Sequence, residues 1–285
     1  MFVSPNGLQV GTVGGGVMEA RIVDRAREVF ATRGAPELRT LHHRRDVSPG
    51  TEPSGLICAG RQTMLHLLAG PDQLPLFRRL ADAVDADEEL LFVVDDQGPR
   101  FEAGAADPSR SPIQFEQSPN GFVYREQILN HKRVAIIGSG HCGLALSRVM
   151  FDLGYRVTVF EQRPNVFTFV ENEWAHEKHA VVDYSEAGPL VRHPCLTHLV
   201  VMTADYPSDV RALLGAIALP FPYKGVMGSP AKLKAIYEDL RTAGANEDLI
   251  ASLYAPIGLE MTSDTPEEIA ISVAAQILRE RPRQL

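Results

Sequence analysis

An apolar run leads directly into a glycine-rich turn in the second half of the chain, at Val134-Ala135-Ile136-Ile137-Gly138-Ser139-Gly140-His141-Cys142-Gly143. The pattern predicts a strand over residues 133–137 and a helix over residues 141–153, joined by this turn. The next predicted strand, residues 156–160, is followed by Glu161, 23 residues after Gly138. A strand, a glycine turn, a helix and an acidic residue at this spacing are typical of a dinucleotide-binding fold.

This turn predicts a cofactor-binding site that comprises Gly138, Gly140, Gly143 and Glu161. Glycines let a phosphate approach the helix amides, and the carboxylate can accept hydrogen bonds from ribose hydroxyls. NAD(P) and FAD are the cofactors that the pattern favours, with Arg163 as an alternative partner for a 2′-phosphate. A structural interpretation stays open, in which the glycines only let the strand and the helix pack closely.

The rest of this half alternates strands with helices. We predict strands over residues 179–182, 198–202 and 223–227, and helices over residues 208–218, 230–243 and 266–280. Such alternation indicates a parallel sheet covered by helices on both faces, which makes the second half a Rossmann-like α/β domain.

A second glycine-rich segment, Gly11-Thr12-Val13-Gly14-Gly15-Gly16, lies between a predicted hairpin and a predicted helix that begins near Val17. The amides of Gly14, Gly15 and Gly16 are free to surround an anion at the positive end of that helix. Glu19 lies in the first turn. Its carboxylate complements the helix dipole or, alternatively, accepts hydrogen bonds from an amino-pyrimidine edge such as that of a pterin.

A thiol lies on a predicted turn at Gly55-Leu56-Ile57-Cys58-Ala59-Gly60. Cysteine is often a small buried core residue, and this interpretation stays open. A thiolate is also a soft ligand for molybdenum or copper, so Cys58 is our candidate metal ligand and Gly60 belongs to the same candidate site.

Composition bounds the class of protein. The chain has 285 residues, a length that favours two domains. Its formal net charge of −8 argues against a surface that binds the phosphates of nucleic acids. We place the first domain at residues 1–118, a linker at 119–130 and the second domain at 131–285. No apolar run approaches the roughly 20 residues that span a bilayer, and no leader opens the chain, so we expect a cytoplasmic protein without a membrane contact.

Together these motifs resemble the XdhC/CoxI family, the xanthine dehydrogenase accessory proteins. Both glycine-rich segments and the Cys58 turn are similar to signatures of this family. Three further stretches also match its pattern: Gly225-Val226-Met227-Gly228-Ser229, Ala255-Pro256-Ile257-Gly258-Leu259 and Thr265-Pro266-Glu267-Glu268-Ile269-Ala270. The resemblance implies an N-terminal α/β XdhC/CoxI-type domain, without the family's first strand–helix unit, and a C-terminal Rossmann domain.

The resemblance also implies a function. Family members bind the molybdenum cofactor (molybdopterin), protect it while a terminal sulfido ligand is installed, and deliver it to a xanthine dehydrogenase-type enzyme. By this resemblance, Gly14, Gly15, Gly16, Glu19, Cys58 and Gly60 hold the cofactor, a cysteine desulfurase is a partner, and the chain forms a homodimer. We therefore expect a chaperone without turnover, with an NAD(P)- or FAD-dependent oxidoreductase as the alternative.

Overall fold

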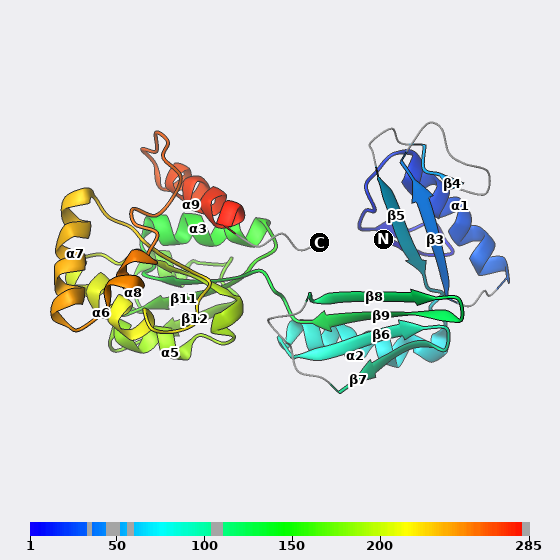
Figure 1. Cartoon of the computed structure of the whole chain (residues 1–285), viewed down its shortest axis with the longest axis horizontal. Helices are drawn as coiled ribbons and strands as arrows, with labels where there is room; N and C mark the ends of the chain where they lie inside the picture. Colours follow the sequence, from blue (N-terminus) through cyan, green and yellow to red (C-terminus); the bar gives the residue numbers. More distant parts are fainter. Residues whose placement is uncertain (33–35, 44–51, 56–59, 104–110, 281–285) are drawn as a thin grey trace. The chain divides into compact units, whose positions relative to one another are not determined.

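The computed structural model describes residues 1–32, 36–43, 52–55, 60–103 and 111–280, which form two compact units (Figure 1). Unit 1 comprises Met1–Asp107 and Pro112–Leu129, and unit 2 comprises Pro108–Ser111 and Asn130–Leu285. No helix of the described residues is long and apolar enough to cross a membrane.

Unit 1 contains a two-stranded hairpin and two further sheets. The hairpin joins β1 (Phe2–Val3) to β2 (Gln9–Val10), and helix α1 (Val17–Thr32) follows it. A three-stranded sheet has the order β4-β3-β5, and a four-stranded antiparallel sheet has the order β7-β6-β9-β8, with α2 (Leu74–Asp85) between them in sequence. The strands are β3 (Glu37–His42), β4 (Glu52–Pro53), β5 (Arg61–His66), β6 (Leu90–Asp95), β7 (Gly98–Glu102), β8 (Ile113–Ser118) and β9 (Gly121–Ile128).

The structure differs from the predicted linker at 119–130. Residues 121–128 form β9, which pairs with β6 on one side and β8 on the other. Ser118 faces Gly121 across the pair, so Pro119 and Asn120 form a tight hairpin turn. Proline favours the first central position of such a turn because its ring fixes φ, and Gly121, the residue after the turn, has a φ of +147°. This turn belongs to a hairpin within unit 1, and the boundary between the units follows Leu129.

Unit 2 is a parallel five-stranded sheet with the order β12-β11-β10-β13-β14. Its strands are β10 (Arg133–Ile137), β11 (Arg156–Glu161), β12 (Glu177–Ala180), β13 (Thr197–Val201) and β14 (Tyr223–Val226). The main helices are α3 (His141–Asp152), α6 (Tyr206–Ala216), α7 (Pro230–Thr242) and α9 (Pro266–Glu280), and the shorter ones are α4 (Phe167–Val170), α5 (Ala187–Leu190) and α8 (Glu247–Ala251). The α/β Rossmann-like prediction for this half is confirmed.

Helices cover both faces of this sheet because the central strands are apolar on both sides. Val134 and Ile136 of β10 pack into one core, on the face covered by α3 and α9. Ala135 and Ile137 point the other way, into the core with residues of α5, α6 and α7. Figure 1 shows α3 and α9 side by side on one face and α5 on the other.

The strand order places the candidate residues of unit 2 at the carboxyl ends of the parallel strands. From β10 the chain runs to β11 and β12 on one side, then crosses to β13 and β14 on the other. Ligands of open α/β sheets bind at the carboxyl ends of the strands, where this order reverses. The loops after β10 and β13 meet there, because a Cβ placed on Gly138 would lie 2.5 Å from the Met202 carbonyl oxygen.

Candidate functional sites in the two units

The triple-glycine loop of unit 1 joins β2 to α1 and requires glycine for its backbone. Gly14, Gly15 and Gly16 have φ values of +120°, +78° and +62°, which side-chain-bearing residues rarely adopt. A Cβ on any of the three would meet nothing within 4 Å. Space is therefore open around the loop, and backbone conformation alone explains the residue type.

Glu19 reaches back from the first turn of α1 into this loop. Its Oε1 accepts hydrogen bonds from the Val13 amide (3.3 Å), the Gly15 amide (3.1 Å) and the Thr12 hydroxyl. The Thr12 hydroxyl, with these two amides, lowers the pKa of Glu19 below its ordinary value. Within the described part of the chain, no hydrogen-bond donor contacts Oε2.

This contact changes the expected role of the loop amides. We predicted that they surround a ligand anion, but Val13 and Gly15 donate to Glu19, and the Gly14 amide donates to the Thr12 hydroxyl at 3.2 Å. The protein's own oxygens occupy these donors. The loop thus fixes the Glu19 carboxylate through one of its two oxygens.

Cys58 lies outside the described residues, but its described neighbours lie beside the triple-glycine loop. The Gln62 side-chain amide donates to the Val13 carbonyl at 3.4 Å. A Cβ on Gly55 would lie 2.9 Å from Cγ1 of Val17, so that backbone passes close to the start of α1. Gly60 has a φ of +138°, and its carbonyl accepts from the His43 amide at 2.9 Å.

In unit 2, two of the three motif glycines are required by packing. Gly138 has a φ of +104°, and its Cβ would clash with backbone atoms of Met202 and Thr203. A Cβ on Gly143 would lie 2.4 Å from the Gly138 carbonyl oxygen. These two contacts agree with the structural interpretation of the motif.

Gly140 differs from both. It is the N-cap of α3, with an ordinary φ of −73° and no side-chain capping bond. A Cβ at Gly140 would meet nothing within 4 Å. The first amides of a helix have no carbonyl partner within the helix, so an anion can reach this helix start.

Glu161 is fully buried and saturated with hydrogen bonds. Its Oε2 accepts from the Ser139 amide at 2.8 Å, and its Oε1 accepts from the Tyr184 hydroxyl at 2.8 Å and the Arg163 amide at 3.0 Å. The Arg163 guanidinium also contacts both oxygens. We predicted that this carboxylate accepts hydrogen bonds from a ribose. In the structure it accepts one from the Ser139 amide of the glycine turn instead.

The pKa of Glu161 reflects two opposing causes. Burial raises it, because a charge is poorly solvated there, but bonds from Arg163, the Ser139 amide and Tyr184 outweigh burial. The net pKa is lowered, so Glu161 is ionised near neutral pH. In turn, burial and this carboxylate raise the pKa of Tyr184.

Ser139 connects the same turn to α4. The Ser139 hydroxyl donates to the Thr168 carbonyl at 3.1 Å, and the Thr168 hydroxyl donates to the Ser139 carbonyl. With Glu161, these bonds hold the turn rigidly against the segment after β11. We did not predict Thr168 or Tyr184, because no short-range pattern connects them to the turn.

A second buried carboxylate at this edge also escaped prediction. Asp209 Oδ1 accepts from the Thr203 amide (2.9 Å) and hydroxyl (2.6 Å), and Oδ2 pairs with Lys232 Nζ at 2.5 Å. Asp209 is fully buried. Thr203 is only six residues from Asp209 in the sequence, but Lys232 comes from the next helix and only the fold brings it here.

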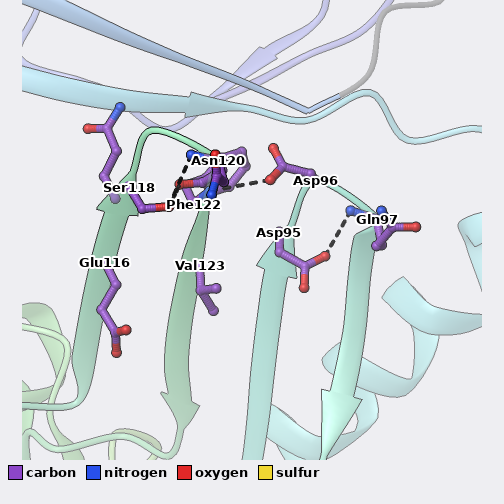
Figure 2. A pocket seen from close by; sticks show the side chains of 10 residues that line it. Asp95, Asp96, Gln97, Glu116, Ser118, Asn120, Phe122 and Val123 are labelled. Carbon is purple, nitrogen blue, oxygen red and sulfur yellow. Dashed lines mark hydrogen bonds between the residues drawn. The ribbon is translucent and has the colours of Figure 1, made fainter.

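Two cavities of unit 1 have none of the three loop glycines among their lining residues. One, of about 380 Å³, lies at the tips of two hairpins of the four-stranded sheet and is lined by Asp95, Asp96 and Glu116 among others (Figure 2). Figure 2 shows Asp96 bonded to the Phe122 amide and Asp95 to the Gln97 amide. A second, of about 360 Å³, lies between α1, β3 and β4.

Charged pairs line that second cavity. Arg25 pairs with Glu28 and Glu37, and Arg39 pairs with Glu52 at 2.7 Å. Among the described residues, no group of three His, Cys, Asp or Glu side chains is placed to hold a metal ion. Neither cavity combines with the predicted site residues.

Similarity to known proteins extends over both units. Residues 134–277 match the family described as the XdhC Rossmann domain, and residues 1–42 match the XdhC and CoxI family. An uncharacterised Escherichia coli protein, YqeB, is 29% identical over 148 residues, which are 52% of this chain and 27% of that protein. A Bacillus subtilis protein whose name describes it as a probable subunit of xanthine dehydrogenase is 26% identical over 171 residues, 59% of this chain and 48% of that protein.

The chain thus spans about half or less of the length of these curated relatives. A crystal structure described as a xanthine dehydrogenase from Bacillus halodurans has a TM-score of 0.70 and 21% identity. The match covers 98% of this chain and 84% of that one, and at this identity it shows the fold alone. Because the Rossmann-domain match alone covers half of the sequence, and the first 42 residues match the same family, the chain belongs to the XdhC/CoxI family.

Proposed function

We propose that this protein is an accessory protein of molybdenum hydroxylases. It binds the molybdenum cofactor, protects it while it is sulfurated, and delivers it to a xanthine dehydrogenase-type enzyme. Family membership in both units supports the role, as does the name of the Bacillus subtilis relative. The observation that supports a particular site is the Glu19 carboxylate, which the triple-glycine loop binds through one oxygen only.

The residues of unit 1 suit the pterin end of this cofactor. A pterin presents N–H donors along its amino-pyrimidine edge, and a carboxylate is a strong acceptor for such donors. Glu19 is held through Oε1 and retains Oε2 for a ligand. The amides of Val13, Gly14 and Gly15 are less suited to the cofactor's phosphate, because they already donate to Glu19 or Thr12.

The dithiolene-bound molybdenum supplies a centre that takes a terminal sulfido ligand when the cofactor is bound. In this proposal Cys58 is the soft donor from the chain. Its described neighbours Gly55 and Gln62 contact the region of Glu19, which supports a single site made of both segments. Gly60, directly before β5, has a positive φ that glycine adopts readily.

Binding of purified molybdopterin to the full chain tests this site. We expect a stoichiometry near one by native mass spectrometry, and a loss of affinity of roughly tenfold in Glu19→Ala, because a charge-assisted hydrogen bond is lost. Glu28→Ala is the matched control, since Glu28 is a carboxylate on the same helix that pairs with Arg25 instead. Equal binding by Glu19→Ala and Glu28→Ala would remove Glu19 from the site.

Delivery needs a second measurement. Cofactor-loaded protein should activate a cofactor-free xanthine dehydrogenase-type enzyme faster than the same amount of free cofactor does, and Cys58→Ala should reduce that advantage. Turnover of NAD(P)H or a flavin by the purified chain would favour the oxidoreductase alternative. The homodimer, the desulfurase contact and the cytoplasmic location stay predictions.

A further inference from the structure

Arg163 follows β11 at the ligand-binding edge of unit 2, and its guanidinium is both fixed and accessible. Its Nε lies 2.9 Å from Oε1 of Glu161, and one terminal nitrogen, Nη2, lies 3.3 Å from Oε2. About half of the side chain is exposed. Among the residues that the structure describes, no acceptor contacts its other terminal nitrogen, Nη1.

Glu161 and Arg163 thus differ in what they can bind: Glu161 is not accessible to a ribose, whereas Arg163 is accessible to a phosphate. Recognition of a free ribose diol needs an acceptor that the ribose can reach, and Glu161 is buried with both oxygens bonded inside the protein. Arg163, held by that carboxylate, presents N–H donors in a fork that matches a phosphate. Because its rotamer is already fixed, it loses little conformational entropy when an anion binds.

We propose that unit 2 binds a nucleotide whose ribose carries a phosphate monoester, and that Arg163 selects this phosphate over a free ribose hydroxyl. In this arrangement Glu161 is a positioning residue. Its carboxylate orients the Arg163 guanidinium through hydrogen bonds, and it also accepts a hydrogen bond from the Ser139 amide of the glycine turn. The inference concerns unit 2 and does not rest on the cofactor site proposed for unit 1.

Other charges face Arg163 and set the strength of binding. Asp205, at the start of α6, lies within electrostatic range of Arg163, Arg211 and Lys232. Arg211 pairs with Asp183, and Lys232 pairs with Asp209, so neither neutralises Asp205 by a direct ion pair. A phosphate at Arg163 therefore binds against the residual repulsion of Asp205.

Calorimetric titration of the full chain with NADP⁺ and NAD⁺ tests the proposal. We expect NADP⁺ to bind at least tenfold more tightly than NAD⁺ at low salt. Arg163→Gln should remove most of this ratio by weakening NADP⁺, since a charge-assisted phosphate contact is lost. NAD⁺ affinity should change by less than about threefold, because NAD⁺ lacks the phosphate.

Two controls separate recognition from damage to the fold. Arg241→Gln removes an arginine of similar exposure from the last turn of α7, where it pairs with Glu247, and should leave the ratio of affinities nearly unchanged. Asp205→Asn should tighten NADP⁺ binding severalfold, because it removes a repelling charge. Asparagine retains the N-cap bond that Asp205 accepts from the Ser208 amide, so α6 should still begin in the same way.

Three results would overturn the inference: equal affinity for both nucleotides, no binding of either, or an NADP⁺ affinity that Arg163→Gln leaves unchanged. A molybdopterin titration with the same variants keeps this inference apart from the proposed function. Molybdopterin binding that depends on Arg163, without any NADP⁺ binding, would assign the arginine to the cofactor's own phosphate and would also overturn the nucleotide. Molybdopterin binding that ignores Arg163 leaves the unit 1 site intact whichever way the nucleotide result falls.

Discussion

The two units each contain a glycine-rich loop whose amides donate to a nearby carboxylate, yet the two carboxylates have opposite environments. Glu19 receives two amides and a hydroxyl on one oxygen, at a partly exposed loop with open space around its glycines. Glu161 receives bonds on both oxygens and is fully buried. The same local arrangement therefore presents an acceptor in unit 1 and stabilises a turn in unit 2, and burial decides which.

Substitution of the two carboxylates should give the largest contrast. Glu161→Gln should destabilise unit 2 by about 2–3 kcal/mol, because it removes a buried carboxylate that accepts hydrogen bonds from the Ser139 amide and the Tyr184 hydroxyl. Glu19→Gln should leave the unfolding midpoint of unit 1 nearly unchanged. Urea unfolding measures both, since the single tryptophan, Trp174, lies in unit 2 and far-UV circular dichroism reports the whole chain. Similar losses in both variants would break the comparison.

Alanine substitution should cost more stability in the glycine loop of unit 2 than in that of unit 1. Gly138→Ala should cost about 2–4 kcal/mol, because a methyl group meets the Met202 backbone at a positive φ. Gly14→Ala should cost about 1–2 kcal/mol, the backbone term alone, because nothing surrounds its Cβ position. The same unfolding curves provide the measurement, and an equal cost at both positions would argue against close packing at Gly138.

The dependence of unfolding free energy on pH in the acid range tests the role of the buried Glu161 carboxylate. The pKa of Glu161 is lower in the folded chain, so its contribution is fully present above the ordinary carboxyl pKa of about 4.3 and is lost as pH falls through the folded value. Unit 2 should therefore lose stability below about pH 4.3, and Glu161→Gln should flatten this part of the profile. Tryptophan-detected unfolding across the acid range up to neutral pH tests it, and identical slopes in both proteins would contradict the assignment.

Gly140→Ala should have the smallest effect on stability, below about 1 kcal/mol, because its φ is ordinary and its Cβ position is open. Gly140→Val should fold as well and yet weaken nucleotide binding, since the larger side chain fills the approach to the start of α3. Gly143→Ala, one turn along the helix, is the comparison variant that should disturb packing. Unfolding and titration of the three variants separate these two effects.

Much of unit 2 was predictable because its signals are local. The buried run before Gly138, the helix after it and the alternation that follows each depend on neighbours within a few residues, and these elements are confirmed. The linker prediction failed for a related reason. Pro119 and Asn120 form a turn, and only the pairing of β9 with β6 and β8 shows that the chain returns into the same sheet.

The sequence by itself determined the Rossmann-like half, the positions of both glycine loops and the family. Tertiary structure decided what the carboxylates do, because the burial of Glu161 and its bonds to Ser139 and Tyr184 join residues more than twenty positions apart. It also brought Lys232 to Asp209, from a different helix. Solvent access and long-range partners set the chemistry of an ionisable side chain, and neither is encoded in the residues next to it.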